Sequence, residues 1–123
     1  MGLDIEKTRE YYKSIKPEDL CGCAYCKNYR LQIKEAYPLV ADYLDALGID
    51  IEKPLETSPL EPDEDGMIEY CVCQYIALGN AADGLVGKVG DVEVGIAASY
   101  PATDIQSEHF VIDIYSVRLK WVL

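Results

Sequence analysis

The most restrictive feature of the sequence is a stripe of apolar residues between positions 26 and 47. They recur in steps of three and four, the spacing of one face of an α-helix, and they are Cys26, Tyr29, Ile33, Tyr37, Val40, Leu44 and Leu47. Pro38 lies inside the stripe, where proline removes a backbone hydrogen bond and clashes with the preceding turn. We therefore expect one kinked helix, or two helices over about residues 24–36 and 38–47 that end at Gly48.

The segments on either side of this stripe have weaker patterns. Residues 3–15 predict a short amphipathic helix or an extended arm, which ends at Pro17. Residues 49–66 contain Pro54, Pro59 and Pro62, which exclude both a long helix and a central strand. We expect this segment to be an extended, ordered connection with a turn at Asp65-Gly66.

Beyond residue 66 the pattern changes to the two-residue alternation of β-strands. Residues 67–78 are apolar on both faces, which is typical of an inner strand. The residues expected on one face of this strand are Ile68, Tyr70, Val72, Ile76 and Leu78. Strands are also predicted at 85–98, with a hairpin turn at Gly90-Asp91, and at 108–115 and 117–123. Residues 79–84 are expected to form a loop.

Helices followed by a run of strands indicate the α+β class. A chain of 123 residues fits a single domain. Residues 1–48 are expected to be mainly helical, residues 49–66 to form the proline-rich connection, and residues 67–123 to be mainly strands. The predicted architecture is an N-terminal helical segment packed on an antiparallel sheet of four or five strands.

The charge balance restricts the partners. A net charge of −11 argues against nucleic acid and anionic membranes, both of which require clustered basic residues. No apolar run approaches the roughly 18–20 residues that cross a bilayer, and the N-terminus has no hydrophobic signal core. We therefore expect a cytoplasmic protein whose acidity serves either a basic protein partner or simple solubility. A protein partner and a homo-oligomer both stay open as partners.

Three of the five cysteines lie within the six residues 21–26. An odd number of cysteines in a chain without a signal argues for reduced thiols or metal ligands instead of a disulfide framework. Cys21, Cys23 and Cys26 could supply three thiolates to a structural zinc ion, which needs four ligands. The candidates for the fourth ligand are Cys71, Cys73 and His109.

Two other interpretations of the same thiols stay open. Cys23-x-x-Cys26 at the start of a helix favours a thiol-redox site, because the helix N-terminus stabilises a thiolate. The third interpretation is that the thiols only pack at the start of the helix, where Cys26 falls on the apolar stripe.

The sequence contains no recognisable catalytic set. It has one histidine and neither G-x-G-x-x-G nor G-x-S-x-G. The sequence contains ten tyrosines but only one phenylalanine and one tryptophan. A tyrosine packs its ring while its hydroxyl reaches a polar partner, which suits binding surfaces. Those near the cysteines form a candidate binding surface: Tyr11, Tyr12, Tyr25 and Tyr29. We therefore expect a small acidic domain that acts by binding and not by catalysis, with a zinc or thiol-redox site as the alternative.

One set of motifs spans most of the chain. It consists of Cys21-x-Cys23-x-x-Cys26-x-Asn28-Tyr29, Tyr37-Pro38, Leu47-Gly48-Ile49-Asp50, Lys53-Pro54, Glu56, Gln74-Tyr75-Ile76 and Leu119-Lys120-Trp121. Together these motifs resemble a family of small uncharacterised bacterial proteins. The resemblance implies a small bacterial cytoplasmic domain and carries no activity with it. Cys71 and Cys73 lie outside the shared pattern.

Overall fold

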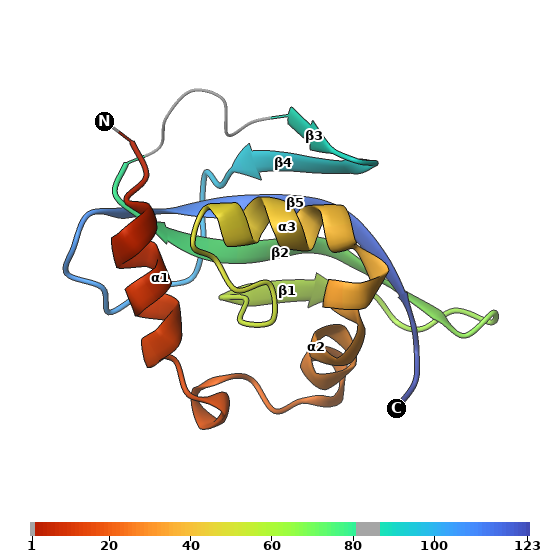
Figure 1. Ribbon diagram of the computed structural model, residues 1–123. Helices are drawn as coiled ribbons and strands as arrows, with labels where there is room; N and C mark the ends of the chain where they lie inside the picture. The colour runs from red at the N-terminus through yellow and green to blue at the C-terminus, as the bar shows by residue number, and fades with distance from the viewer. Residues whose placement is uncertain (1, 81–86) are drawn as a thin grey trace.

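The computed structural model describes residues 2–80 and 87–123. Its helical elements are α1 (Ile5–Ser14), the 3-10 turn η1 (Pro17–Asp19), α2 (Ala24–Ala36) and α3 (Pro38–Ala46). Its strands are β1 (Glu56–Pro59), β2 (Met67–Leu78), β3 (Gly87–Val89), β4 (Val92–Ile96) and β5 (His109–Lys120). Figure 1 shows the helices of the first part of the chain against the sheet of the second part.

The strands form one antiparallel sheet in the order β1-β2-β5-β4-β3. The two 12-residue strands β2 and β5 lie next to each other in it and pair from Met67↔Lys120 to Leu78↔His109. The predicted α+β class, with N-terminal helices on an antiparallel sheet, is confirmed.

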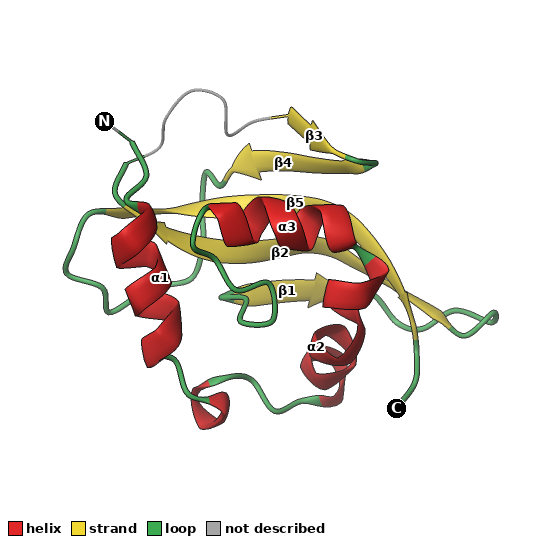
Figure 2. Cartoon of the chain, in the orientation of Figure 1, coloured by secondary structure: helices red, strands yellow, loops and turns green. Residues whose placement is uncertain are grey.

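The helices pack through the predicted stripe. α2 and α3 lie over one face of the sheet, and α1 stands at the end where β2 finishes (Figure 2). The helices contribute Tyr12, Tyr29, Ile33, Val40 and Leu44 to the main core, each at most 3% exposed. Their contacts on the sheet include Tyr70, Tyr75, Ile112, Ile114 and Val117. The stripe therefore positions α2, which carries the cysteines at its start.

The break inside the stripe is a proline and its end is a glycine, as predicted. Pro38 is the first residue of α3, where its missing N–H costs no helical hydrogen bond. Gly48 has a φ of +86°, which L side chains rarely adopt. A Cβ there would lie 2.6 Å from the carbonyl oxygen of Ile5. Gly48 therefore both ends α3 and lets the chain approach the backbone of α1 closely.

The proline-rich connection contains a short strand that the sequence does not indicate. β1 pairs with β2 through Glu56↔Gln74 and Thr57↔Cys73, and the register shifts before Pro59. It is an edge strand, where proline is tolerated because one side of the strand needs no hydrogen-bond donor.

The prediction that β2 keeps one face throughout is wrong. Ile68 and Tyr70 belong to the main core, but further along the strand Cys73, Tyr75 and Ala77 do. Beyond that point Ile76 and Leu78 join a small second cluster with Val111. Between Tyr70 and Cys73, the side of β2 that faces the main core therefore changes.

The neighbouring strand β5 changes face at the matching position. Phe110, Ile112 and Ile114 lie in the main core, and so do Val117 and Leu119. Ser116 separates the two sets with a φ of +64°. Two strands were predicted here, at 108–115 and 117–123. The structure has one strand, because a single left-handed residue shifts the alternation without ending the pairing with β2.

The predicted hairpin turn at Gly90-Asp91 is confirmed by the pairing of Val89 with Val92, and Gly90 has a φ of +63°. The loop predicted at 79–84 and the strand start predicted at residue 85 lie largely in residues 81–86, outside the described residues.

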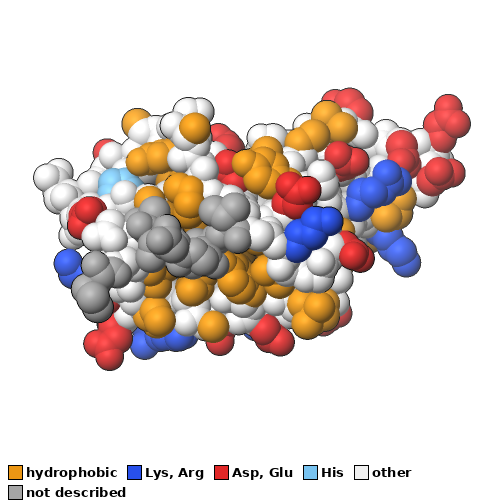
Figure 3. Space-filling model, turned by 90° about the horizontal axis from the view of Figure 1, so that it is seen from above, with side chains coloured by type: hydrophobic (Ala, Val, Ile, Leu, Met, Phe, Trp, Pro, Cys, Tyr) orange, Lys and Arg blue, Asp and Glu red, His pale blue; other side chains and the backbone are white. Residues whose placement is uncertain are grey.

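Charge is spread over the surface. Acidic side chains line the rim of the face shown in Figure 3 and gather at one end of it, with fewer basic side chains between them. Within residues 2–80 and 87–123, no helix has the length and apolar character needed to cross a membrane.

Candidate functional site

The sulfur atoms of Cys21, Cys23 and Cys26 all lie within 4.8 Å of one another. Among the described residues, they form the only group of three or more His, Cys, Asp or Glu side chains close enough to share an ion. We call these three residues the cysteine triad. Cys21 and Cys23 are exposed, and Cys26 is half-buried.

The start of α2 holds the triad together. Cys23 is the N-cap residue, and its sulfur accepts a hydrogen bond from the backbone N–H of Cys26 at 3.4 Å. The Arg30 guanidinium donates to the carbonyl oxygen of Cys21 at 2.8 Å. The Cys26 sulfur lies 3.8 Å from the Thr57 hydroxyl of β1, which ties the triad to the sheet.

The same geometry gives the thiols of Cys23 and Cys26 different pKa values. The backbone N–H of Cys26, followed by hydrogen bonds with the neighbouring thiols, lowers the pKa of Cys23. Burial, followed by hydrogen bonds to the other two sulfurs, raises the pKa of Cys26 to about 12. Cys23 therefore has the greater thiolate character of the two, and the thiolate is the form in which a cysteine attacks or ligates.

Asn28 holds the first turns of α2 against the end of β5. It is fully buried, and its amide donates to the carbonyl oxygen of Lys120 at 2.9 Å. The Asn28 side-chain oxygen accepts from the backbone N–H of Val122 at 2.9 Å. A polar residue directly before the buried Tyr29 is a visible sequence signal, but these two backbone partners lie 92 and 94 residues away and could not be named.

Tyr70 adds a second attachment beside the triad. Its hydroxyl donates to the carbonyl oxygen of Tyr25, which lies between Cys23 and Cys26. The Tyr25 ring packs on Trp121 with centroids 5.4 Å apart, and its hydroxyl donates to Glu61. The triad therefore sits on a segment that core and C-terminal residues hold in place.

The structure brings none of the three predicted fourth ligands into the triad. Cys73 is buried, and burial raises the pKa of its thiol to about 12. Cys71 is half-buried in β2. His109 bonds instead to the Thr103 hydroxyl at 2.9 Å and donates to the carbonyl oxygen of Ser107 at 2.8 Å.

The predicted tyrosine surface requires a correction. Tyr12 and Tyr29 are 3% and 0% exposed, so they are core residues that no partner can contact. Their hydroxyls are satisfied inside the protein, by the carbonyl oxygen of Ile76 and by the Tyr75 hydroxyl. Tyr11 and Tyr25 are half-buried.

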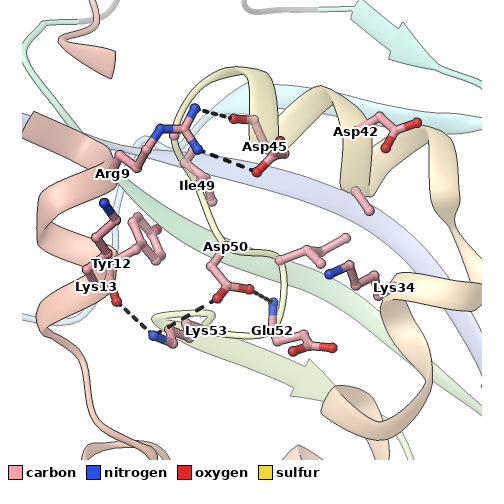
Figure 4. A pocket seen from close by; sticks show the side chains of 13 residues that line it. Arg9, Tyr12, Lys13, Lys34, Asp42, Asp45, Ile49, Asp50, Glu52 and Lys53 are labelled. Carbon is pink, nitrogen blue, oxygen red and sulfur yellow. Dashed lines mark hydrogen bonds and ion pairs between the residues drawn. The ribbon is translucent and has the colours of Figure 1, made fainter. Parts of the chain in front are cut away.

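A separate hollow of about 410 Å³ lies between α1, α3 and residues 48–53 (Figure 4). Four basic and four acidic side chains line it, so their formal charges cancel. Arg9 pairs with Asp45 at 3.6 Å, and the Lys53 amine donates to the carbonyl oxygens of Tyr12 and Ile15. These contacts fasten the end of α1, which gives this hollow a structural role.

Comparison with known protein families, with characterised proteins and with solved structures finds no match to this chain. The resemblance to a bacterial family stays a prediction, and the functional argument depends on the geometry of the site.

Proposed function

We propose that this protein acts by binding a thiophilic metal ion, zinc, through the thiolates of Cys21, Cys23 and Cys26. The observation that carries the proposal is the convergence of the three sulfurs within 4.8 Å. Zinc binds sulfur at about 2.3 Å, so two sulfurs on one tetrahedral ion lie roughly 3.8 Å apart. Small side-chain rotations at an exposed helix start would bring the triad to that spacing.

The ligand set supports a soft ion. Thiolates favour zinc and monovalent copper, whereas magnesium and calcium prefer oxygen ligands. The lowered pKa of Cys23 makes this thiol easier to ionise than an ordinary cysteine. Cys26, with a pKa of about 12, would lose its proton to the solvent as its sulfur ligates the metal, so binding releases protons.

Within residues 2–80 and 87–123, no fourth His, Cys, Asp or Glu joins the triad, which leaves one tetrahedral position for a water or another molecule. Structural zinc sites are closed by four protein ligands, whereas sites with three keep a water or another molecule in the fourth position. Two of the three cysteines are exposed. Both features suit an exchangeable zinc ion.

Thiol–disulfide exchange is the second candidate. The observation that favours it is the lowered pKa of Cys23 at the N-terminus of α2, with the Cys26 sulfur within 4.8 Å. An exposed thiolate next to a second thiol can attack a disulfide substrate and then be released by its neighbour.

Cobalt titration of the metal-free, reduced protein tests the proposal. We expect one Co²⁺ per chain, sulfur-to-metal charge-transfer absorption, and displacement by zinc. C21S, C23S and C26S should each weaken zinc binding by about tenfold or more, whereas the matched variant C71S should stay within twofold. Equal losses in C71S, or no charge-transfer band, would contradict a triad site. Rapid formation of a Cys23–Cys26 disulfide without metal binding would favour the second candidate.

A further inference from the structure

A second hollow, of about 590 Å³, lies on the face of the sheet opposite the helices. Ile112 and Ile114 of β5 point into the main core, so Asp113 between them points to the other face. In Figure 1 the helices lie on the viewer's side of β2 and β5, so this face is turned away. Asp113, Gln74, Tyr100 and Tyr115 are among the residues that line the hollow.

Asp113 is a buried acid held by neutral partners. Asp113 is only 7% exposed to solvent. One carboxylate oxygen accepts from the Gln74 amide and the other from the Tyr115 hydroxyl, both at 2.9 Å. Among the described residues that line the hollow, there is no lysine, arginine or histidine. A buried carboxylate normally has a cationic partner, and here each oxygen keeps a lone pair for one.

The surroundings of Asp113 suit a planar cation. The Tyr115 ring lies over Gly95, where an added Cβ would be 3.7 Å from the ring. Tyr100, which is 41% exposed, is the second aromatic ring of the lining. Glu93 lies beside Tyr115 in the register, and Lys88 of β3 lies opposite Glu93. A guanidinium can bond a carboxylate through two parallel N–H groups and stack on an aromatic ring, which an ammonium cannot do.

We propose that this hollow binds the arginine side chain of a basic partner protein. The guanidinium bridges the two oxygens of Asp113, which Gln74 and Tyr115 hold in a fixed orientation. A chain with a net charge of −11 attracts a basic partner over long range. The site is independent of the cysteine triad, which contains none of these residues.

Titration with N-acetyl-arginine amide, followed by the amide resonances of the protein, tests this proposal. We expect shifts at the Gln74 side-chain amide and along β5, and at least tenfold weaker binding of N-acetyl-citrulline amide, the uncharged isostere. D113N should weaken arginine binding about tenfold or more. E64Q, which removes an equal charge in the exposed β1–β2 turn, should stay within twofold.

Equal binding of arginine and citrulline would overturn the proposal, and so would shifts centred on the β1–β2 turn. The ligand comparison uses the unaltered protein, so it decides the question even where D113N does not fold.

Discussion

Asn28 forms no hydrogen bond with the sulfur atoms of the triad, yet it fixes the helix that carries them. Its buried amide group joins α2 to both the carbonyl oxygen of Lys120 and the N–H of Val122. Loss of the Asn28 side chain leaves the N–H of Val122 without its partner, whereas the carbonyl oxygen of Lys120 keeps the Gln32 amide as a donor. An unpaired buried polar group costs about 1–3 kcal/mol.

We therefore expect N28A to lower the free energy of unfolding by about 1–3 kcal/mol. Urea unfolding followed by circular dichroism measures the change. N80A is the matched control, because the Asn80 side chain is exposed and surface substitutions usually change stability by less than about 0.5 kcal/mol. Equal effects of the two substitutions would show that the Asn28 contacts contribute nothing.

A substitution of Cys23 tests its role as a helix cap separately from its proposed role as a metal ligand. Its sulfur caps α2 through the N–H of Cys26, and serine is among the preferred N-cap residues. C23S should therefore leave the stability of the metal-free protein within about 0.5 kcal/mol while removing the stabilisation that added zinc provides. Urea unfolding with and without zinc measures both. Loss of stability in the metal-free C23S protein would indicate that the thiol has a packing role.

At the scale of elements, the contact between α1 and the end of α3 depends on Gly48. Alanine there would be strained at a φ of +86° and would place its Cβ against the backbone of Ile5. We expect G48A to destabilise the protein by about 3 kcal/mol or more, measured by urea unfolding. G66A is the control: Gly66 also has a positive φ, of +76°, but a Cβ there meets nothing within 4 Å.

The conformation alone should make G66A cost about 1–2 kcal/mol. A G48A protein no less stable than G66A would show that the close approach of Gly48 to α1 is unimportant.

The helices could be predicted because their signals are local. The stripe, Pro38 and Gly48 all lie within the segment that they organise. The change of face along β2 and β5 could not, because no local pattern shows the left-handed Ser116 that shifts the alternation. β1 was missed for a similar reason: its pairing with β2 compensates for weak local strand signals.

Part of the candidate site could likewise be predicted from the sequence and part could not. The spacing of Cys21, Cys23 and Cys26 along one helix start predicts their proximity, and the structure brings them together. The contacts of Asn28 and Thr57 with their distant partners depend on tertiary packing. The burial of Tyr12 and Tyr29 does too, which is why these tyrosines were wrongly assigned to a surface.

At the scale of the whole molecule, three buried tyrosines should make the folded state less stable at alkaline pH. Burial raises the pKa values of Tyr12, Tyr29 and Tyr75 well above the ordinary value of 10.0. In the unfolded chain they would lose protons near pH 10, whereas in the folded protein they keep them. The folded state then binds more protons, so the stability that these tyrosines contribute is fully present below about pH 10 and falls as the pH rises further.

Each of these tyrosines should remove about 1.4 kcal/mol per pH unit above 10. We expect urea midpoints to fall slightly from about pH 8 to pH 9, because unfolding lets the Cys26 and Cys73 thiols ionise, whose pKa the folded protein raises to about 12. The midpoints should then fall steeply by about pH 11. Tyrosinate absorbance should appear together with unfolding. Full ionisation of all ten tyrosines while the circular dichroism of the folded protein persists would contradict this expectation.

The most direct test of the central claim is the zinc content of the unaltered protein. The protein is purified under reducing conditions without chelators, and its zinc and its reactive thiols are measured together. The account predicts about one zinc per chain, with the cysteine triad protected from thiol reagents until the metal is removed. Less than about 0.2 zinc per chain after incubation with excess zinc, with Cys21 and Cys23 freely reactive, would contradict it.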